Sequence, residues 1–135
     1  MNLFVDTSVW SFAFRRDTPS DAPQVAVLQS ALETGDSIFT TGLILQELLQ
    51  GVAGPKARES LIERFATLPY LMPDRDDHVR AAALHGACRK KGRQITTIDA
   101  LLAALCIRHH LTMLSMDQDF EHIAEIEPLN LWRTA

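Results

Sequence analysis

The sequence MNLFVDTSVW at residues 1–10 contains a short apolar run, residues 3–5, that ends at Asp6. A continuous apolar run is typical of a parallel strand that is covered on both faces. Such a strand would place Asp6 at the carboxyl edge of the sheet, where open α/β folds bind their ligands. Asp6 could instead cap a helix that begins at Thr7, because Asp is a favoured N-cap residue.

Apolar runs and helical patterns alternate along the whole chain. Strands are predicted at residues 3–5, 37–41, 70–72, 111–116 and 129–132. Helices are predicted at residues 7–14, 22–33, 42–54, 55–68, 74–91, 97–110 and 119–126. Strands that alternate with helices require right-handed crossovers and a mainly parallel sheet. We therefore predict the α/β class, with helices on both faces of the sheet.

The composition restricts the class of protein. The chain of 135 residues suits a single domain, residues 1–135, that buries about two thirds of its unfolded surface. No apolar run reaches the ~18 residues of a membrane span, and no signal-peptide pattern is present, so a cytoplasmic location is expected. The formal net charge of -4 predicts no overall attraction for nucleic acid. A polyanion would therefore need a local basic patch or metal ions.

Two acidic residues are expected to meet where a buried helix reverses into a strand. The helix of residues 97–110, which we expect Thr97 to cap, and the strand of residues 111–116 each measure ~20 Å. Because these lengths match, an immediate reversal places Asp99 beside Asp117. Asp117 could also serve only as the cap of the helix that follows it.

Further acidic residues are expected at the same edge. Glu47 lies about one helical turn after the strand of residues 37–41, within ~6 to 9 Å of its end. Parallel strands put that end on the same side as Asp6, and Asp119 lies nearby in sequence to Asp117. Each acid alone has a structural explanation, since a helix dipole favours a carboxylate at its N-terminus by ~0.3 to 1 kcal/mol. Glu47 is harder to explain, because it interrupts a leucine-rich helix, although its neighbours Gln46 and Gln50 could mark a solvated edge.

The convergence of carboxylates predicts a metal site. Clustered anions in a partly buried crevice repel each other, so a cation must neutralise them. Oxygen ligands without a neighbouring set of His or Cys favour Mg²⁺ or Mn²⁺ over Zn²⁺. One or two such ions can activate water and neutralise the charge that develops on a phosphodiester. The sequence thus predicts metal-assisted phosphodiester hydrolysis.

Four segments, LFVDTSVW, LQELLQG, GRQITTIDALLAA and LSMDQDF, follow one another along the chain. In content and order they resemble the PIN-domain family and, within it, the VapC-like toxin ribonucleases of bacterial toxin-antitoxin pairs. The resemblance covers essentially the whole chain. One departure is Ser115, where many relatives carry threonine.

The resemblance implies a three-layer α/β/α sandwich with strand order 3-2-1-4-5, Mg²⁺-dependent endonucleolytic cleavage of RNA, and a homodimer. It also implies a cognate antitoxin whose tail enters the acidic pocket, often with an arginine. By this carry-over, four acids hold metal or position water: Asp6, Glu47, Asp99 and Asp117. Asp119 assists them, and Thr7 or Ser8 orients ligands through its hydroxyl.

Basic and aromatic residues supply weaker hypotheses. Contact with the RNA backbone is one interpretation of two basic groups, and solvated helix ends are the other. These groups are Arg89, Lys90, Lys91 and Arg93, and Arg15 and Arg16. Core packing is the default for the aromatic residues, with base stacking and dimer contact as alternatives; they are Trp10, Phe12, Phe14 and Trp132.

Two non-enzymatic alternatives accompany the nuclease hypothesis. A receiver-like phosphorylation module is also α/β with a Mg²⁺-binding acidic pocket. It would normally show paired acids after the first strand, a phosphoacceptor Asp after the third and a lysine after the last full strand, and this sequence shows none of these. The other alternative is an inactive PIN-like protein that only sequesters a partner.

Overall fold

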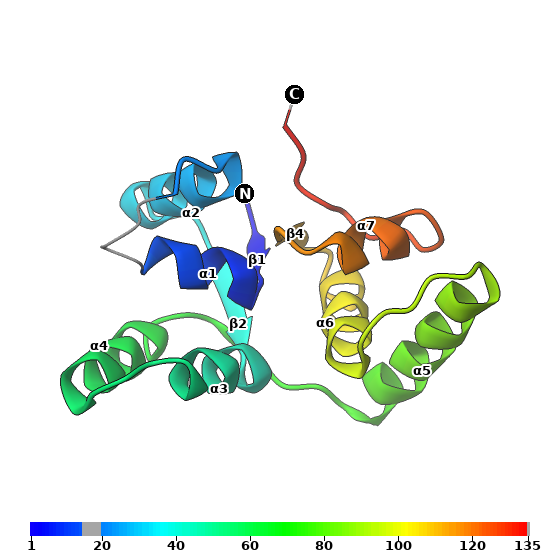
Figure 1. Ribbon diagram of the computed structural model, residues 1–135, viewed down its shortest axis with the longest axis horizontal. Coiled ribbons are helices and arrows are strands. Elements are labelled where there is room, and N and C mark those ends of the chain that lie inside the picture. The colour runs from blue at the N-terminus through cyan, green and yellow to red at the C-terminus, as the bar shows by residue number, and fades with distance from the viewer. Residues whose placement is uncertain (15–19, 135) are drawn as a thin grey trace.

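A computed structural model of the chain describes residues 1–14 and 20–134 (Figure 1). Its strands are β1 (Leu3–Val5), β2 (Ile38–Thr41), β3 (Tyr70–Leu71) and β4 (Thr112–Leu114). The helices within these ranges are α1 (Thr7–Ala13), α2 (Pro23–Thr34), α3 (Gly42–Gln50), α4 (Pro55–Phe65), α5 (Arg75–Lys90), α6 (Thr97–Arg108) and α7 (Gln118–Ala124). The predicted α/β class is therefore confirmed.

The four strands form one parallel sheet in the order β3-β2-β1-β4. The central strand β1 pairs Leu3 with Ile38 of β2, and Val5 with Leu114 of β4. Leu3, Phe4 and Val5 are completely buried, as expected for a strand covered on both faces. Because all strands run in one direction, the residues that follow β1 and β4 emerge side by side.

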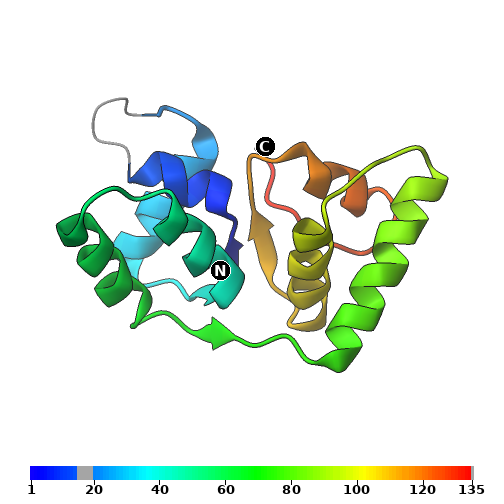
Figure 2. The same ribbon diagram turned by 60° about the horizontal axis from the view of Figure 1, so that its bottom comes forward.

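The helices form two layers with the sheet between them. Figures 1 and 2 show α1 to α4 on one side of the sheet and α5 to α7 on the other. Right-handed crossovers explain this division, because the chain moves from β1 to β3 in one direction and then returns to β4 in the other. None of the described helices is both long and apolar enough to cross a membrane.

The predicted strand at residues 129–132 is reduced to a single bridge between Leu131 and Met113. Two backbone hydrogen bonds hold it: the Met113 N–H donates to the carbonyl of Asn130 (2.8 Å), and the Trp132 N–H donates to the carbonyl of Met113 (2.9 Å). The observed order is thus 3-2-1-4, with this bridge where the resemblance implied a fifth strand. Pro128 precedes the segment and has no N–H, which limits how far pairing can extend.

Two predicted boundaries also need correction. The N-cap of α6 is Thr96 and not Thr97, since the Thr96 hydroxyl accepts a hydrogen bond from the Asp99 N–H at 3.1 Å. Strand β4 ends at Leu114, before the predicted end at residue 116, because the Met116 N–H donates to the hydroxyl of Ser8 instead of pairing in the sheet. Both differences arise from side-chain hydroxyls that compete for backbone groups.

An ion pair joins α5 to α6 at the end far from Asp99. Asp77 is only 1% exposed and accepts hydrogen bonds from Arg108 Nε (2.7 Å) and Nη2 (2.8 Å). Asp77 also forms a capping box with Asp74 at the start of α5. This network fixes the orientation of α6, the helix that carries Asp99.

Candidate metal centre

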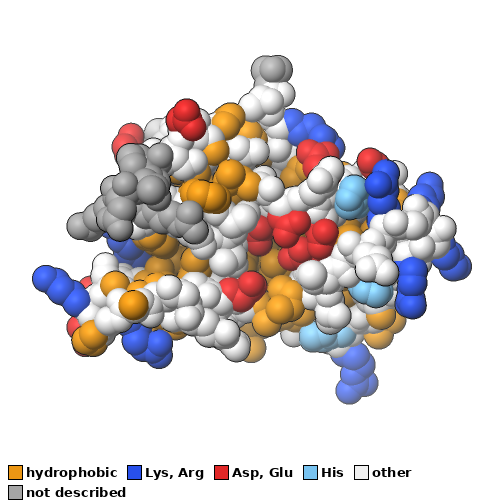
Figure 3. Space-filling view, in the orientation of Figure 1, with side chains coloured by type: hydrophobic (Ala, Val, Ile, Leu, Met, Phe, Trp, Pro, Cys, Tyr) orange, Lys and Arg blue, Asp and Glu red, His pale blue; other side chains and the backbone are white. Residues whose placement is uncertain are grey.

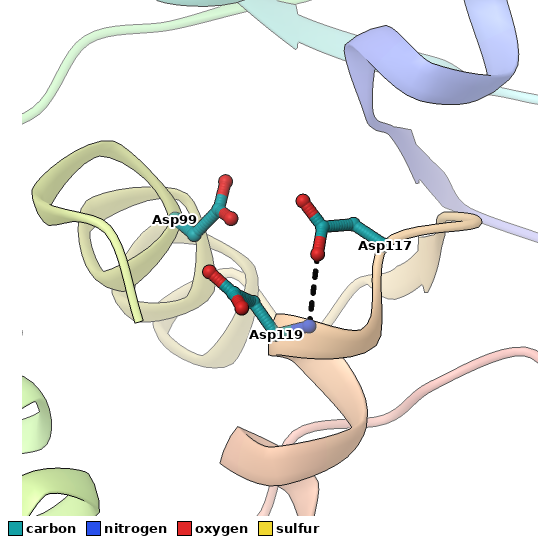
Figure 4. A group of neighbouring side chains, drawn as sticks. All are labelled: Asp99, Asp117 and Asp119. Carbon is teal, nitrogen blue, oxygen red and sulfur yellow. Dashed lines mark hydrogen bonds between the residues drawn. The ribbon is translucent and has the colours of Figure 1, made fainter. Parts of the chain in front are cut away.

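Three aspartates gather where α6 and α7 begin: Asp99, Asp117 and Asp119. Each offers a carboxylate oxygen, and these oxygens all lie within 4.8 Å of one another. Figure 4 shows the three side chains pointing toward one another, Asp99 from α6, Asp119 from α7 and Asp117 from the loop just before α7. Asp99 is buried, Asp119 is half-buried and Asp117 is exposed. We call these three residues the aspartate cluster.

Hydrogen bonds to backbone groups hold the aspartate cluster in shape. Thr96 uses its hydroxyl to cap α6, and its N–H donates to Asp119 Oδ2 at 3.2 Å. Asp117 caps α7, and its Oδ1 accepts from the Asp119 N–H at 2.9 Å. The cap role foreseen as an alternative for Asp117 is therefore real, and it coexists with a place in the cluster.

Asp6 lies at the end of β1, where the sequence predicted it. Its N–H donates to the Leu114 carbonyl at 3.0 Å, and its side chain is only 5% exposed. Asp6 occupies the N-cap position of α1 but makes no side-chain capping bond. Its Oδ2 instead accepts hydrogen bonds from Ser8 and Ser115, each at 2.9 Å. The interpretation of Asp6 as merely a cap is wrong.

Ser115, noted from the sequence only as a departure from the family pattern, contacts Asp6 directly. Its hydroxyl donates to Asp6 and accepts from the Asp117 N–H at 2.9 Å. Ser8 acts in the same way, since its hydroxyl donates to Asp6 and accepts from the Met116 N–H at 3.0 Å. The two serines therefore tie Asp6 to the loop that carries Asp117. A hydroxyl residue at the exit of a buried strand, two positions before an acid, was the available signal.

Glu47 and Thr7 lie beside Asp6 and outside the aspartate cluster. Partial burial and the negative charge of Asp6 raise the pKa of the exposed Glu47 carboxyl, and the Thr7 hydroxyl opposes this rise. The Thr7 hydroxyl is itself buried and makes no hydrogen bond of ordinary length to another described residue. Asp6 also interacts electrostatically with Asp99 and Asp117, so its charge couples to both Glu47 and the aspartate cluster.

The electrostatics of the site call for a cation. Burial, a hydrogen bond with Asp119 and the charges of Asp117, Asp6 and Asp119 together raise the pKa of Asp99 to about 8. Burial likewise raises the pKa of Asp6, against the hydrogen bonds from its two serines. The ion pairs among residues 1–14 and 20–134 include no member of the aspartate cluster. An oxygen-only donor set with excess negative charge fits Mg²⁺ or Mn²⁺.

The molecular surface carries a group of acidic side chains on one face. Figure 3 shows acidic side chains grouped at the centre of one face, while the basic side chains visible in this view lie towards its margins. Arg89, Lys90 and Lys91 are exposed at the end of α5, and Arg93 lies 3.9 Å from Glu125. Their predicted contact with RNA stays a prediction. Arg15 and Arg16, the other predicted contacts, lie outside the described residues.

The chain is similar in sequence to proteins of one family. Residues 3–126 match the PIN domain. Ribonuclease VapC11 of Mycobacterium tuberculosis is 33% identical over 129 residues, which cover 94% of this chain and 95% of that protein. Ribonuclease VapC23 of the same species is 30% identical over 89% of this chain and 93% of its own length.

Solved structures agree on the fold. The structure of VapBC-1 from nontypeable Haemophilus influenzae superimposes with a TM-score of 0.74, covering 98% of this chain and 97% of that chain at 15% identity. VapBC2 from Rickettsia felis gives a TM-score of 0.71 at 18% identity, with 98% of each chain covered. The sequence match, the parallel sheet and the cluster of acids at its carboxyl edge together show that this chain belongs to the PIN-domain family and, within it, to the VapC ribonucleases.

Proposed function

We propose that this protein is a Mg²⁺-dependent endoribonuclease and the toxin of a type II toxin-antitoxin pair. The observation that carries the proposal is the aspartate cluster, in which oxygens from three carboxylates lie within 4.8 Å of one another. Both the VapC11 and the VapC23 relatives are ribonucleases by name. A family match over residues 3–126 favours this reading over a receiver-like module.

The aspartate cluster would hold the ion, with Asp6 and Glu47 completing the acidic site. Once bound, Mg²⁺ would supply Lewis acidity for the attacking water and for the charge on the phosphodiester. Helices α6 and α7 both begin at this cluster, and the positive ends of their dipoles stabilise its carboxylates. A divalent ion that binds here would displace the proton that the cluster otherwise holds and would neutralise its negative charge.

Ser8 and Ser115 act as positioning residues for Asp6. Two hydrogen bonds of 2.9 Å hold Asp6 Oδ2, so the carboxylate keeps one orientation without solvent reorganisation. A carboxylate held in this way can orient a water molecule or accept its proton. Glu47, coupled to Asp6 by charge, and the nearby Thr7 hydroxyl extend the same polar surface.

Two partners belong to the proposal. The acidic centre is complementary to a basic side chain, so a cognate antitoxin would inhibit by inserting a cation such as arginine. The family resemblance also implies a homodimer, which light scattering would report as twice the 15.1 kDa mass of the chain.

The test is cleavage of a structured RNA by the purified protein with Mg²⁺ or with excess EDTA. We expect cleavage only with Mg²⁺, and loss of at least 100-fold in rate for Asp99→Asn, since a metal ligand is removed. Asp76→Asn is the matched control, because Asp76 is exposed on α5 away from the cluster. Equal cleavage in EDTA refutes the metal mechanism. Growth arrest without any RNA cleavage supports the partner-sequestering alternative.

A further inference from the structure

A cavity of about 520 Å³ opens beside the aspartate cluster and shares Asp117 with it. Its other walls include Gln24 on α2, Gln118 at the start of α7, Ser115, and Trp132 in the C-terminal segment. Figures 1 and 2 show the C-terminal segment passing between α2 and α7. The volume lies within the roughly 300 to 1,000 Å³ of ordinary ligand sites.

Trp132 is fixed relative to the cluster by its backbone. Its N–H donates to the carbonyl of Met113 in β4 at 2.9 Å, and its neighbour Leu131 forms the bridge to the same residue. Strand β4 leads within three residues to Asp117. The backbone at Trp132 is therefore fixed near the acids, and its half-buried side chain lines the cavity. Indole rings provide the flat face on which nucleobases stack.

The charges around the cavity disfavour a phosphate and suit an uncharged ring. Its charged residues are Asp117, Glu121 and Arg133, and Arg133 Nη1 already bonds Glu121 Oε2 at 2.6 Å. The lining therefore carries one net negative charge. Gln24 and Gln118 add side-chain amides, each with donors and an acceptor, which match the hydrogen-bonding edge of a base.

We propose that this cavity binds the base of a nucleotide next to the scissile phosphate. Trp132 stacks on the base, and the amides of Gln24 and Gln118 bond its edge. The inference rests on the proposed ribonuclease function, which places the phosphodiester at the aspartate cluster. The cavity thus contributes to the choice of cleavage site in single-stranded RNA.

The first test compares how the wild type and its variants cleave a random-sequence single-stranded RNA pool in Mg²⁺. The new RNA ends are sequenced to give the base preference beside the cut. Trp132→Ala should raise KM by about 5- to 150-fold, the usual value of one base stack, and weaken the base preference at one position beside the cut. Trp132→Phe keeps an aromatic face, so its KM and its base preference should stay close to those of the wild type. Gln24→Ala should alter the preference at that position, whereas its control Gln29→Ala, exposed on the same helix, should not.

The second test measures fluorescence while an eight-nucleotide mixed-sequence RNA is added to the Asp6→Asn variant in Mg²⁺. The chain has two tryptophans and Trp10 is only 2% exposed, so a stacked base should quench Trp132. Should Trp132→Ala fail to fold, this quenching and the Gln24→Ala result decide the question.

The two proposals fail in different ways. Wild-type cleavage with no quenching, and with unchanged KM and base preference in the folded variants, overturns the base site and leaves the nuclease intact. Saturable quenching without wild-type cleavage supports the base site and refutes the nuclease.

Discussion

Raising the pH from 6.5 to 8.0 should tighten Mg²⁺ binding by about 15-fold, because a proton and the metal compete for the aspartate cluster. Burial and the surrounding acids raise the pKa of Asp99 to about 8 in the metal-free protein. The carboxyl is then about 3% ionised at pH 6.5 and about half ionised at pH 8.0. The ratio of these fractions gives the change in apparent affinity.

Isothermal titration calorimetry in buffers of different ionisation enthalpy measures this linkage. We expect about one proton released per Mg²⁺ bound at pH 6.5, and about half a proton at pH 8.0. Asp99→Asn removes a metal ligand, so its Mg²⁺ binding and the accompanying proton release should both be lost at either pH. The exposed Asp76→Asn variant controls for a general change in charge. Binding that is independent of pH and releases no proton would show that Asp99 is not protonated in the metal-free site.

Other predictions concern stability and positioning. In EDTA, at pH values between about 3.8 and about 8, Asp99 is protonated in the folded state and ionised in the unfolded state. The free energy of unfolding should therefore fall as pH rises through this window. Urea denaturation should show Asp99→Asn gaining stability relative to wild type from pH 6 to pH 8, and a constant difference contradicts the linkage. Ser115→Ala, which removes one hydrogen-bond donor to Asp6, should slow single-turnover cleavage by about 10-fold. Ser115→Thr keeps a hydroxyl and should cleave at the wild-type rate. Equal rates for all three proteins would show that Ser115 does not position Asp6. Asp77→Ala should lower the free energy of unfolding by about 2 kcal/mol. This is less than for a fully buried ion pair, because Arg108 is 38% exposed. A loss no greater than that of Asp76→Asn would show that the Asp77–Arg108 pair does not stabilise the fold.

Two features of the site could be predicted because they follow from backbone geometry. The apolar run before Asp6 indicates a buried strand, and a buried parallel strand ends at the ligand edge. The reversal from α6 into β4, together with the residues that follow β4, brings Asp117 back next to Asp99. Neither inference needs a side-chain conformation.

The misjudged features depend on side-chain and loop hydrogen bonds. Asp119 was expected only to assist, but the bond from the Thr96 N–H and the start of α7 at Gln118 bring it into the cluster. Ser115 was judged only as a departure from the family pattern, because its bond to Asp6 spans 109 positions of sequence. Such long-range partners have no periodic signal. The fifth strand was overestimated because apolar residues after Pro128 indicate burial but do not fix the length of pairing.

Crystals soaked in Mn²⁺ test the central claim most directly, because Mn²⁺ replaces Mg²⁺ and is located by its anomalous scattering. A peak in direct contact with oxygens of Asp99, Asp117 and Asp119 is expected, and no such peak is expected in Asp99→Asn crystals. A fully soaked crystal with no peak at these three carboxylates, or with the same peak in Asp99→Asn, would contradict the central claim.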